Sequence, residues 1–272
     1  MNPVIVYGLL ASLAAGLATG VGALPCLLFR RISDRALDAM LGFAAGVMLA
    51  ATSFSLIVPA IDAGVEGLHW PPIKAVGMVV AGILVGGLFL DRGDKWIPHE
   101  HAIMGAEGPS SSLRKTWLFI LAITIHNFPE GLAVGVGYGG AAGIDPLLDP
   151  ETYGQMIAGG NSLAIGIGLQ NMPEGLAVAV ALLREKFPLG KALLVALLTG
   201  LVEPVGGLLG AGVVSVAQPV LPFAMAFAAG AMLFVISDEI IPETHTHGYQ
   251  RVATFGLLIG FAVMMAMDNL LG

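Results

Sequence analysis

The chain has 272 residues, of which 56% are hydrophobic and only 11% are charged, and its mean hydropathy is +0.86. Soluble domains carry about 25% charged residues, so this composition excludes an ordinary soluble protein and predicts a membrane protein with several spans. The net charge of −7 gives no support for a nucleic-acid partner, and the single cysteine, Cys26, excludes both a disulfide framework and a metal site built from thiolates.

Eight apolar segments are long enough to cross about 30 Å of hydrocarbon. In chain order they run approximately over residues 3–29, 36–60, 72–90, 116–138, 156–183, 190–217, 219–241 and 252–271. We expect the first to be a span and not a signal peptide, because no basic residue precedes it and it is longer than a typical signal-peptide core. The sequence therefore predicts an all-α integral membrane protein whose single transmembrane domain covers residues 1–272.

The basic residues indicate the orientation of these spans. If the N-terminus lies outside, the cytoplasmic connections carry eleven of the twelve basic residues, and only Lys74 lies outside. The eleven are Arg30, Arg31, Arg35, Arg92, Lys95, Arg114, Lys115, Arg184, Lys186, Lys191 and Arg251. The positive-inside rule predicts this asymmetry. We therefore expect a multi-pass protein of the cell (inner) membrane with both termini outside.

The second and seventh segments share a repeated pattern. Residues 43–49 read FAAGVML and residues 227–233 read FAAGAML, and each copy is followed by a proline, Pro59 or Pro242. The two segments cross the membrane in opposite directions, as do the fourth and fifth. We therefore predict an inverted repeat of three, two and three helices, with a ligand site at its pseudo-twofold axis near the bilayer midplane.

The fourth and fifth segments carry a second repeat. Residues 126–134 read HNFPEGLAV and residues 170–178 read QNMPEGLAV, and the sixth segment contains Glu203 followed by Pro204. A charged residue at bilayer depth costs roughly 2.5–3.5 kcal/mol on insertion scales. Acids in matching buried contexts therefore predict a bound cation. A polar cluster that only holds the helices together is the alternative reading.

The spacing of this repeat favours a divalent metal. His126 and Glu130 are one helical turn apart, and so are Gln170 and Glu174. Each nearby proline removes a backbone hydrogen bond and so frees a carbonyl, which in a membrane must face a cavity or an ion. Imidazole, carboxylate and amide ligands suit Zn²⁺, Fe²⁺, Mn²⁺ or Cd²⁺. The predicted ligands are His126, Glu130, Gln170, Glu174 and Glu203, with Asn127 and Asn171 adjacent.

A path for the ion is predicted on both sides of this centre. Met48, Thr52, Ser55 and Asp62 fall near one helical face that becomes more polar towards the outside, so Ser55 and Asp62 are the predicted outer approach. In the seventh segment, the helical face that carries Glu239 and Glu243 becomes acidic towards the cytoplasm. The predicted exit residues are Asp238, Glu239, Glu243, His245 and His247. Solvated helix ends and loop residues are the alternative reading for most of them.

At the two central motifs the chain resembles the ZIP metal transporters, and in detail their GufA-like branch, which pairs HN-x-PEG with QN-x-PEG. The resemblance extends over essentially the whole chain. It implies eight helices with both termini outside, and transport of zinc and related divalent metals into the cytoplasm. It also implies a first metal site at Met48, His126, Glu130, Gln170, Glu174 and Glu203. A second site is implied at Asn127, Glu130, Asn171, Glu174 and Glu203, although some bacterial relatives have aspartate where this chain has Asn171.

Two other functions remain to be weighed. A broad-range divalent metal channel or an exporter could use the same ligands, because binding residues do not encode a driving force. An intramembrane metalloenzyme would need a motif such as HExxH, which is absent, and only His126 lies within a predicted span. We expect no enzyme and no cofactor, with the metal as transported substrate. The expected partners are divalent ions and the lipid bilayer, and a homodimer is left open.

Overall fold

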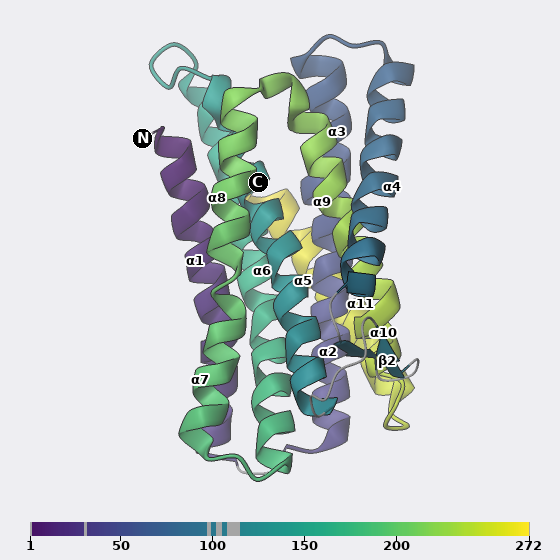
Figure 1. The fold of residues 1–272 in the computed structure, drawn as a ribbon. Coiled ribbons are helices and arrows are strands. Elements are labelled where there is room, and N and C mark those ends of the chain that lie inside the picture. Colours follow the sequence, from purple (N-terminus) through teal and green to yellow (C-terminus); the bar gives the residue numbers. More distant parts are fainter. Residues whose placement is uncertain (1, 30–31, 97–98, 102–104, 108–114, 272) are drawn as a thin grey trace.

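The computed structural model describes residues 2–29, 32–96, 99–101, 105–107 and 115–271, and these form a bundle of long helices (Figure 1). Seven helical segments within the described residues are long and apolar enough to cross a membrane. They are Pro3–Leu27, Asp34–Gly67, Pro72–Gly93, Pro150–Arg184, Leu189–Val216, Gln218–Glu243 and Gln250–Leu271. The predicted all-α membrane protein is therefore confirmed. The remaining predicted span corresponds to α5 (Lys115–Gly139), whose membrane crossing stays a prediction.

The first two segments are helical throughout but not uniformly α-helical, whereas the third lies within one α-helix. Ser33 begins the second segment as its N-cap, and its hydroxyl accepts a hydrogen bond from the Ala36 amide. The second segment also changes twice to a wider π-helix, at Ala51–Ile57 and at Ala63–Gly67. The α-helices are α1 (Pro3–Ala23), α2 (Asp34–Ala50), α3 (Val58–Asp62) and α4 (Pro72–Trp96), and α1 continues as a 3₁₀ turn, Leu24–Leu27.

A short antiparallel hairpin follows α4. Its strands are β1 (His99–His101) and β2 (Gly105–Glu107), and they are the only strands among the described residues. The hairpin lies outside the predicted spans, so it does not alter the helical character of the bundle. Three residues of the predicted basic set, Arg30, Arg31 and Arg114, lie outside the described residues.

The second half of the chain contains one break that its sequence explains. The predicted sixth span is two helices, which are separated at Leu201 and Val202, and Pro204 occupies the first turn of the second helix. In order the helices are α6 (Pro150–Arg184), α7 (Leu189–Gly200), α8 (Glu203–Val216), α9 (Leu221–Val235), α10 (Ile241–Glu243) and α11 (Gln250–Leu271). Between α9 and α10 the chain forms a π-helix, Ile236–Ile240, and 3₁₀ turns lie at Gly140–Gly143 and Gln218–Val220.

The connections gather at the two ends of the bundle. The N-terminus lies at the same end as the connection from α5 to α6 and the connection from α3 to α4 (Figure 1). The turns that lead from α6 to α7 and from α10 to α11 lie at the opposite end. We call that opposite end the basic end, because the predicted cytoplasmic residues Arg184, Lys186 and Arg251 lie in or beside its turns.

The helices pack in two groups. In one, α1 packs along α6 and α8, and α5 packs along α8; in the other, α2 packs along α11 and α4 packs along α9. Repeat glycines make two equivalent close approaches in the second group. Gly46 of α2 lies against the backbone of Leu257 in α11, and Gly230 of α9 lies against the backbone of Ile83 in α4. Small residues at these crossings let the helix backbones meet.

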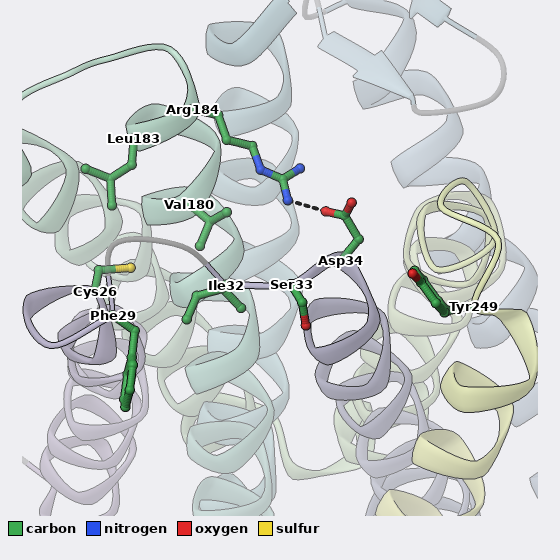
Figure 2. A pocket seen from close by; sticks show the side chains of 9 residues that line it. All are labelled: Cys26, Phe29, Ile32, Ser33, Asp34, Val180, Leu183, Arg184 and Tyr249. Carbon is green, nitrogen blue, oxygen red and sulfur yellow. Dashed lines mark hydrogen bonds and ion pairs between the residues drawn. The ribbon is translucent and has the colours of Figure 1, made fainter.

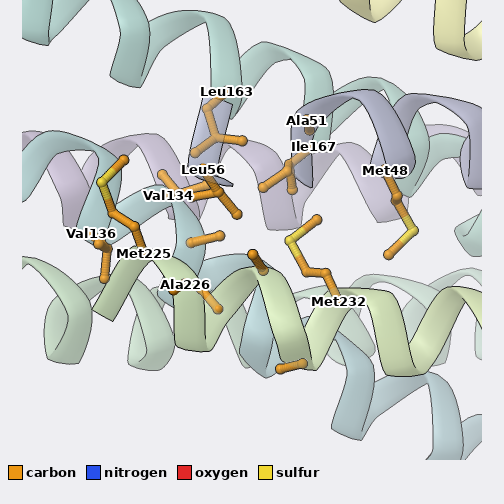
Figure 3. Close-up of a cluster of buried hydrophobic side chains, with 14 of the residues drawn as sticks. Met48, Ala51, Leu56, Val134, Val136, Leu163, Ile167, Met225, Ala226 and Met232 are labelled. Atoms are coloured by element: carbon orange, nitrogen blue, oxygen red, sulfur yellow. The ribbon is translucent and has the colours of Figure 1, made fainter. Parts of the chain in front are cut away.

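The largest apolar cluster lies between the two groups. Met48 and Met232, which occupy equivalent positions in the repeat, are both almost fully buried there (Figure 3). Leu163 and Ile167 of α6 belong to the same cluster and lie less than two turns before Gln170. The cluster therefore lies beside the segment that carries the predicted metal ligands.

Candidate metal site

The predicted central ligands are buried polar residues from three helices. His126 is 5% exposed and Glu174 is 4% exposed. The others have no exposed surface: Asn127, Glu130, Gln170, Asn171 and Glu203. Burial of so many polar groups in a span is costly unless each finds a partner. The polar atoms that have no hydrogen-bond partner therefore indicate where a bound ion is needed.

Asn171 holds one side of the site together. Its side-chain NH₂ donates to Oε1 of Glu203 at 2.6 Å and to the Ala15 carbonyl at 2.9 Å. Its Oδ1 accepts a hydrogen bond from Nε2 of Gln170 at 2.7 Å. These bonds join α6, α8 and α1. The first helix was not part of the predicted site, and a backbone carbonyl at Ala15 leaves no signal in the sequence.

The three central acids lie close together. Glu130 interacts electrostatically with both Glu174 and Glu203, and Glu174 interacts with Glu203. Several of their oxygens have no well-aligned hydrogen-bond partner in the described part of the chain, namely both oxygens of Glu130, Oε1 of Glu174 and Oε2 of Glu203. The side chain of Gln170 lies near Glu130 and interacts with it. Buried acceptors without donors are destabilising, and like charges add to that cost. A cation between the carboxylates would offset both the cost of the unpaired oxygens and the repulsion between the charges.

The acidic and histidine side chains alone do not form a coordination sphere among the described residues. The described residues contain no group of three or more His, Cys, Asp and Glu side chains placed so that they could hold a metal ion. A cation between the carboxylates would offset their mutual repulsion and draw them together. The amides enlarge the donor set, since Oε1 of Gln170 and both polar atoms of the Asn127 side chain also have no hydrogen-bond partner among the described residues.

His126 connects the centre to the predicted exit. Its Nε2 lies 2.9 Å from Oε1 of Glu239, which belongs to the π-helix before α10. The imidazole also interacts electrostatically with Glu174. One side chain therefore faces both a predicted central ligand and a predicted exit residue.

The glycine of each central motif has a structural role that the sequence did not reveal. Gly131 lies against the backbone of Glu203, and Gly175 lies against the backbone of Thr19. Any side chain at either position would collide with the facing helix. The signal was available, since both motifs read Pro-Glu-Gly, but only the packing shows that these glycines bring α5 onto α8 and α6 onto α1.

Met48 lies in the apolar cluster of Figure 3 and is 1% exposed. The structure therefore buries this predicted ligand among apolar neighbours such as Ala51 and Ile167. A thioether is a weak metal ligand that packs well in such a place.

On the predicted outer side, Ser55 and Asp62 lie in different surroundings. Ser55 is 8% exposed and donates its hydroxyl to Oδ1 of Asp268 at 2.5 Å, whereas Asp62 is exposed. Ser55 lies within the π-helix Ala51–Ile57, whereas Asp62 ends the α-helix α3 that follows. A π-helix holds more residues per turn than an α-helix, so the facing expected for one continuous α-helix does not apply to this pair. Asp268 was missed, although an acid near the end of the apolar segment 252–271 was the available signal.

On the predicted cytoplasmic side, the structure adds Asp38 to the predicted residues. Asp38 of α2 is fully buried, and its Oδ1 lies 3.0 Å from Nδ1 of His247. Glu243 interacts electrostatically with Asp38, His247 and Glu239. His245 is exposed, and Asp238 is partly buried in the π-helix. Asp38 was missed because it lies within the predicted second span, where no second motif marked it.

Cys26 lies away from these groups. It is buried and lines a cavity of about 570 Å³ between the ends of α1, α2 and α6, beside an ion pair between Arg184 and Asp34 (Figure 2). The thiol is therefore a packed side chain near the surface of the bundle. It is not part of the central cluster, by which we mean the buried polar residues His126, Asn127, Glu130, Gln170, Asn171, Glu174 and Glu203.

The chain is similar to known proteins over nearly its whole length. Residues 154–268 match the family model described as ZIP Zinc transporter. Zinc transporter GufA of Myxococcus xanthus is 46% identical over 266 residues, which cover 97% of this chain and 99% of that protein. Zinc transporter ZIPB of Bordetella bronchiseptica is 45% identical, with 98% and 82% covered, and human Zinc transporter ZIP11 is 33% identical, with 93% and 94% covered.

Proposed function

The chain belongs to the ZIP family, and we propose from this membership that it carries zinc across a membrane into the cytoplasm. Similar proteins from bacteria and vertebrates are named zinc transporters. Membership of this family agrees with the prediction that the chain is not an enzyme. Fe²⁺, Mn²⁺ and Cd²⁺ are further candidate substrates, since the amide of Gln170 is a less selective ligand than an imidazole.

The transported ion would bind between α5, α6 and α8. The observation that carries this proposal is the group of buried carboxylates, Glu130, Glu174 and Glu203, each of which has at least one oxygen without a hydrogen-bond partner among the described residues. Met48, His126 and Gln170 would complete a first site. Asn127 and Asn171 would take part in an adjacent second one. Because Asn171 is neutral and already donates to Glu203, the second site would be the weaker.

The proposed topology has eight spans as an inverted repeat of three, two and three, both termini outside, in the cell (inner) membrane. The equivalent contacts of Gly46 and Gly230 support the repeat. The pairing of α5 with α8 and of α6 with α1 supports it as well, since an inverted repeat makes these two pairs equivalent. The metal site would then lie near the bilayer midplane, on the pseudo-twofold axis.

The proposed path of the ion runs from Asp62 and Ser55 to the central acids and leaves through Glu239. The 2.9 Å contact between His126 and Glu239 supports the second step, because it brings an exit residue to a central ligand. Asp238, Glu243, His245 and His247 would receive the ion beyond Glu239. Asp38 joins this group through its contact with His247.

Zinc uptake into proteoliposomes tests the function. Purified protein should accumulate zinc from the outside in a saturable manner, and Fe²⁺, Mn²⁺ and Cd²⁺ should compete to different degrees. Wild-type protein that moved no divalent metal in either direction would contradict the proposal. Uptake without saturation would favour a broad channel, and movement only from the cytoplasmic side would favour an exporter.

A further inference from the structure

A second hollow lies on the membrane-facing side of the bundle, away from the central acids. It is an apolar groove of about 670 Å³ between α2, α6 and α11. Its walls are formed mostly by hydrophobic residues, among them Phe43, Met172, Phe255 and Ile259. Phe255 is 66% exposed and Ile259 is 57% exposed, so the groove opens outward. Within a bilayer, that direction faces lipid.

One charged residue lines this groove. Arg35, the second residue of α2, is exposed and lines the groove at the basic end of the bundle. The neighbouring acid, Asp34, is already paired with Arg184. Arg35 has no ion-pair partner among the residues that the structure describes. A cation at the start of a span therefore remains available for an anionic group at the membrane surface.

The length of the groove matches one leaflet. Arg35 and Phe43 both line it, and eight residues of α-helix separate them by about 12 Å. That distance is a little less than half the thickness of the hydrocarbon core. A molecule with an anionic headgroup and an apolar tail would place the headgroup at Arg35 and the tail against Phe43 and Ile259.

We propose that the groove between α2, α6 and α11 binds one anionic phospholipid from the leaflet at the basic end. The charge of Arg35 selects the headgroup, and the apolar walls hold an acyl chain. Because Met172 and Pro173 form one wall, the lipid contacts the segment of α6 that also carries Asn171 and Glu174. The bound lipid lies across the boundary between the two helix groups and contacts both.

The test is native mass spectrometry of the full chain in detergent with phosphatidylglycerol or phosphatidylcholine of identical acyl chains. Wild-type protein should retain one phosphatidylglycerol in preference to phosphatidylcholine. Arg35→Gln should reduce that preference by about fivefold, the factor expected for one arginine near an anionic headgroup. The matched control, Arg92→Gln, removes an exposed arginine that contacts Asp91 instead of the groove, and it should leave the preference unchanged.

A second pair of variants tests the acyl-chain part. Ile259→Trp should fill the groove and reduce binding of both lipids, whereas Leu258→Trp, at an equally exposed position of α11 that does not line the groove, should not. Equal retention of both lipids by wild-type protein, equal effects of Arg35→Gln and Arg92→Gln, or an unchanged Ile259→Trp would overturn the proposal. None of these outcomes depends on zinc transport.

Discussion

Asn171 and Glu203 are joined by a 2.6 Å hydrogen bond in which a neutral amide of α6 donates to a buried acid of α8. The same NH₂ group also donates to the Ala15 carbonyl. The amide therefore positions one carboxylate and ties it to α1 without adding charge. Replacing Asn171 by an acid tests how a neutral side chain at this position affects the stability of the metal-free protein and the binding of zinc.

Asn171→Asp should destabilise the metal-free protein and increase its stabilisation by zinc. The carboxylate cannot donate to Ala15, and it places a further negative charge beside Glu203, at a cost of about 1–3 kcal/mol for the lost donor alone. Thermal unfolding in detergent, with and without zinc, measures both effects. Asn161→Asp is the matched control on α6, because Asn161 is exposed and its Oδ1 accepts from Tyr138. A zinc-induced shift in Tm equal to that of the wild type would contradict the assigned site.

Glu130→Gln and Glu174→Gln should each reduce zinc uptake by about tenfold or more, since weaker changes around metal ligands already cost about 10–100-fold in affinity or activity. The isosteric amide keeps the volume of the side chain, so the protein should still insert and purify. Uptake into proteoliposomes measures the loss. Cys26→Ser, in a separate cavity, should transport at the wild-type rate. Normal uptake by both glutamine variants would remove the carboxylates from the proposed site.

Gly175→Ala should destabilise the protein by about 1–3 kcal/mol, because the added methyl group collides with the backbone of Thr19 and forces α1 away from α6. Gly159→Ala on the same helix meets nothing within 4 Å and should be neutral or slightly stabilising. Chemical denaturation of the detergent-solubilised protein compares the two. Equal midpoints would show that the close contact is not required.

Asp62→Asn and Glu239→Gln should alter different kinetic parameters. Asp62 is exposed at the proposed outer approach, so its loss should raise the zinc concentration needed for half-maximal uptake. Glu239 contacts His126, so its loss should lower the maximal rate. Initial rates over a range of zinc concentrations separate the two effects. Wild-type curves for both variants would refute the proposed path and would leave the central site unaffected.

Labelling of single cysteines should reveal the orientation in intact cells. In a Cys26→Ser background, Leu148→Cys lies in the connection before α6 and should react with an impermeant thiol reagent from outside. Gly190→Cys lies in the first turn of α7, where its side chain meets nothing within 4 Å, and it should react only after the cells are opened. The reverse pattern would invert the proposed direction of transport.

Hydropathy predicted the helical segments, and motif spacing predicted the buried polar residues of the central cluster. Both properties can be recognised within a short stretch of sequence. The π-helices at Ala51–Ile57 and Ile236–Ile240 were not predicted, since apolar composition does not distinguish a π-helix from an α-helix. Partners distant in sequence were missed for a different reason. A single acid such as Asp38 or Asp268 near the end of a span looks like a solvated residue until the facing helix is known.

The position of α1 between α6 and α8 has a consequence for biosynthesis. The first span leaves the ribosome well before Gly175, Gly200 or Glu203 has been made, yet its close contacts are with those later segments. Thr19 and Gly16 therefore enter the bilayer before the surfaces that cover them exist. The helix α1 therefore stays without these partners, in lipid or against an insertion factor, while more than half of the chain is translated. Assembly of the central cluster is then a late event, completed only after the sixth span has inserted.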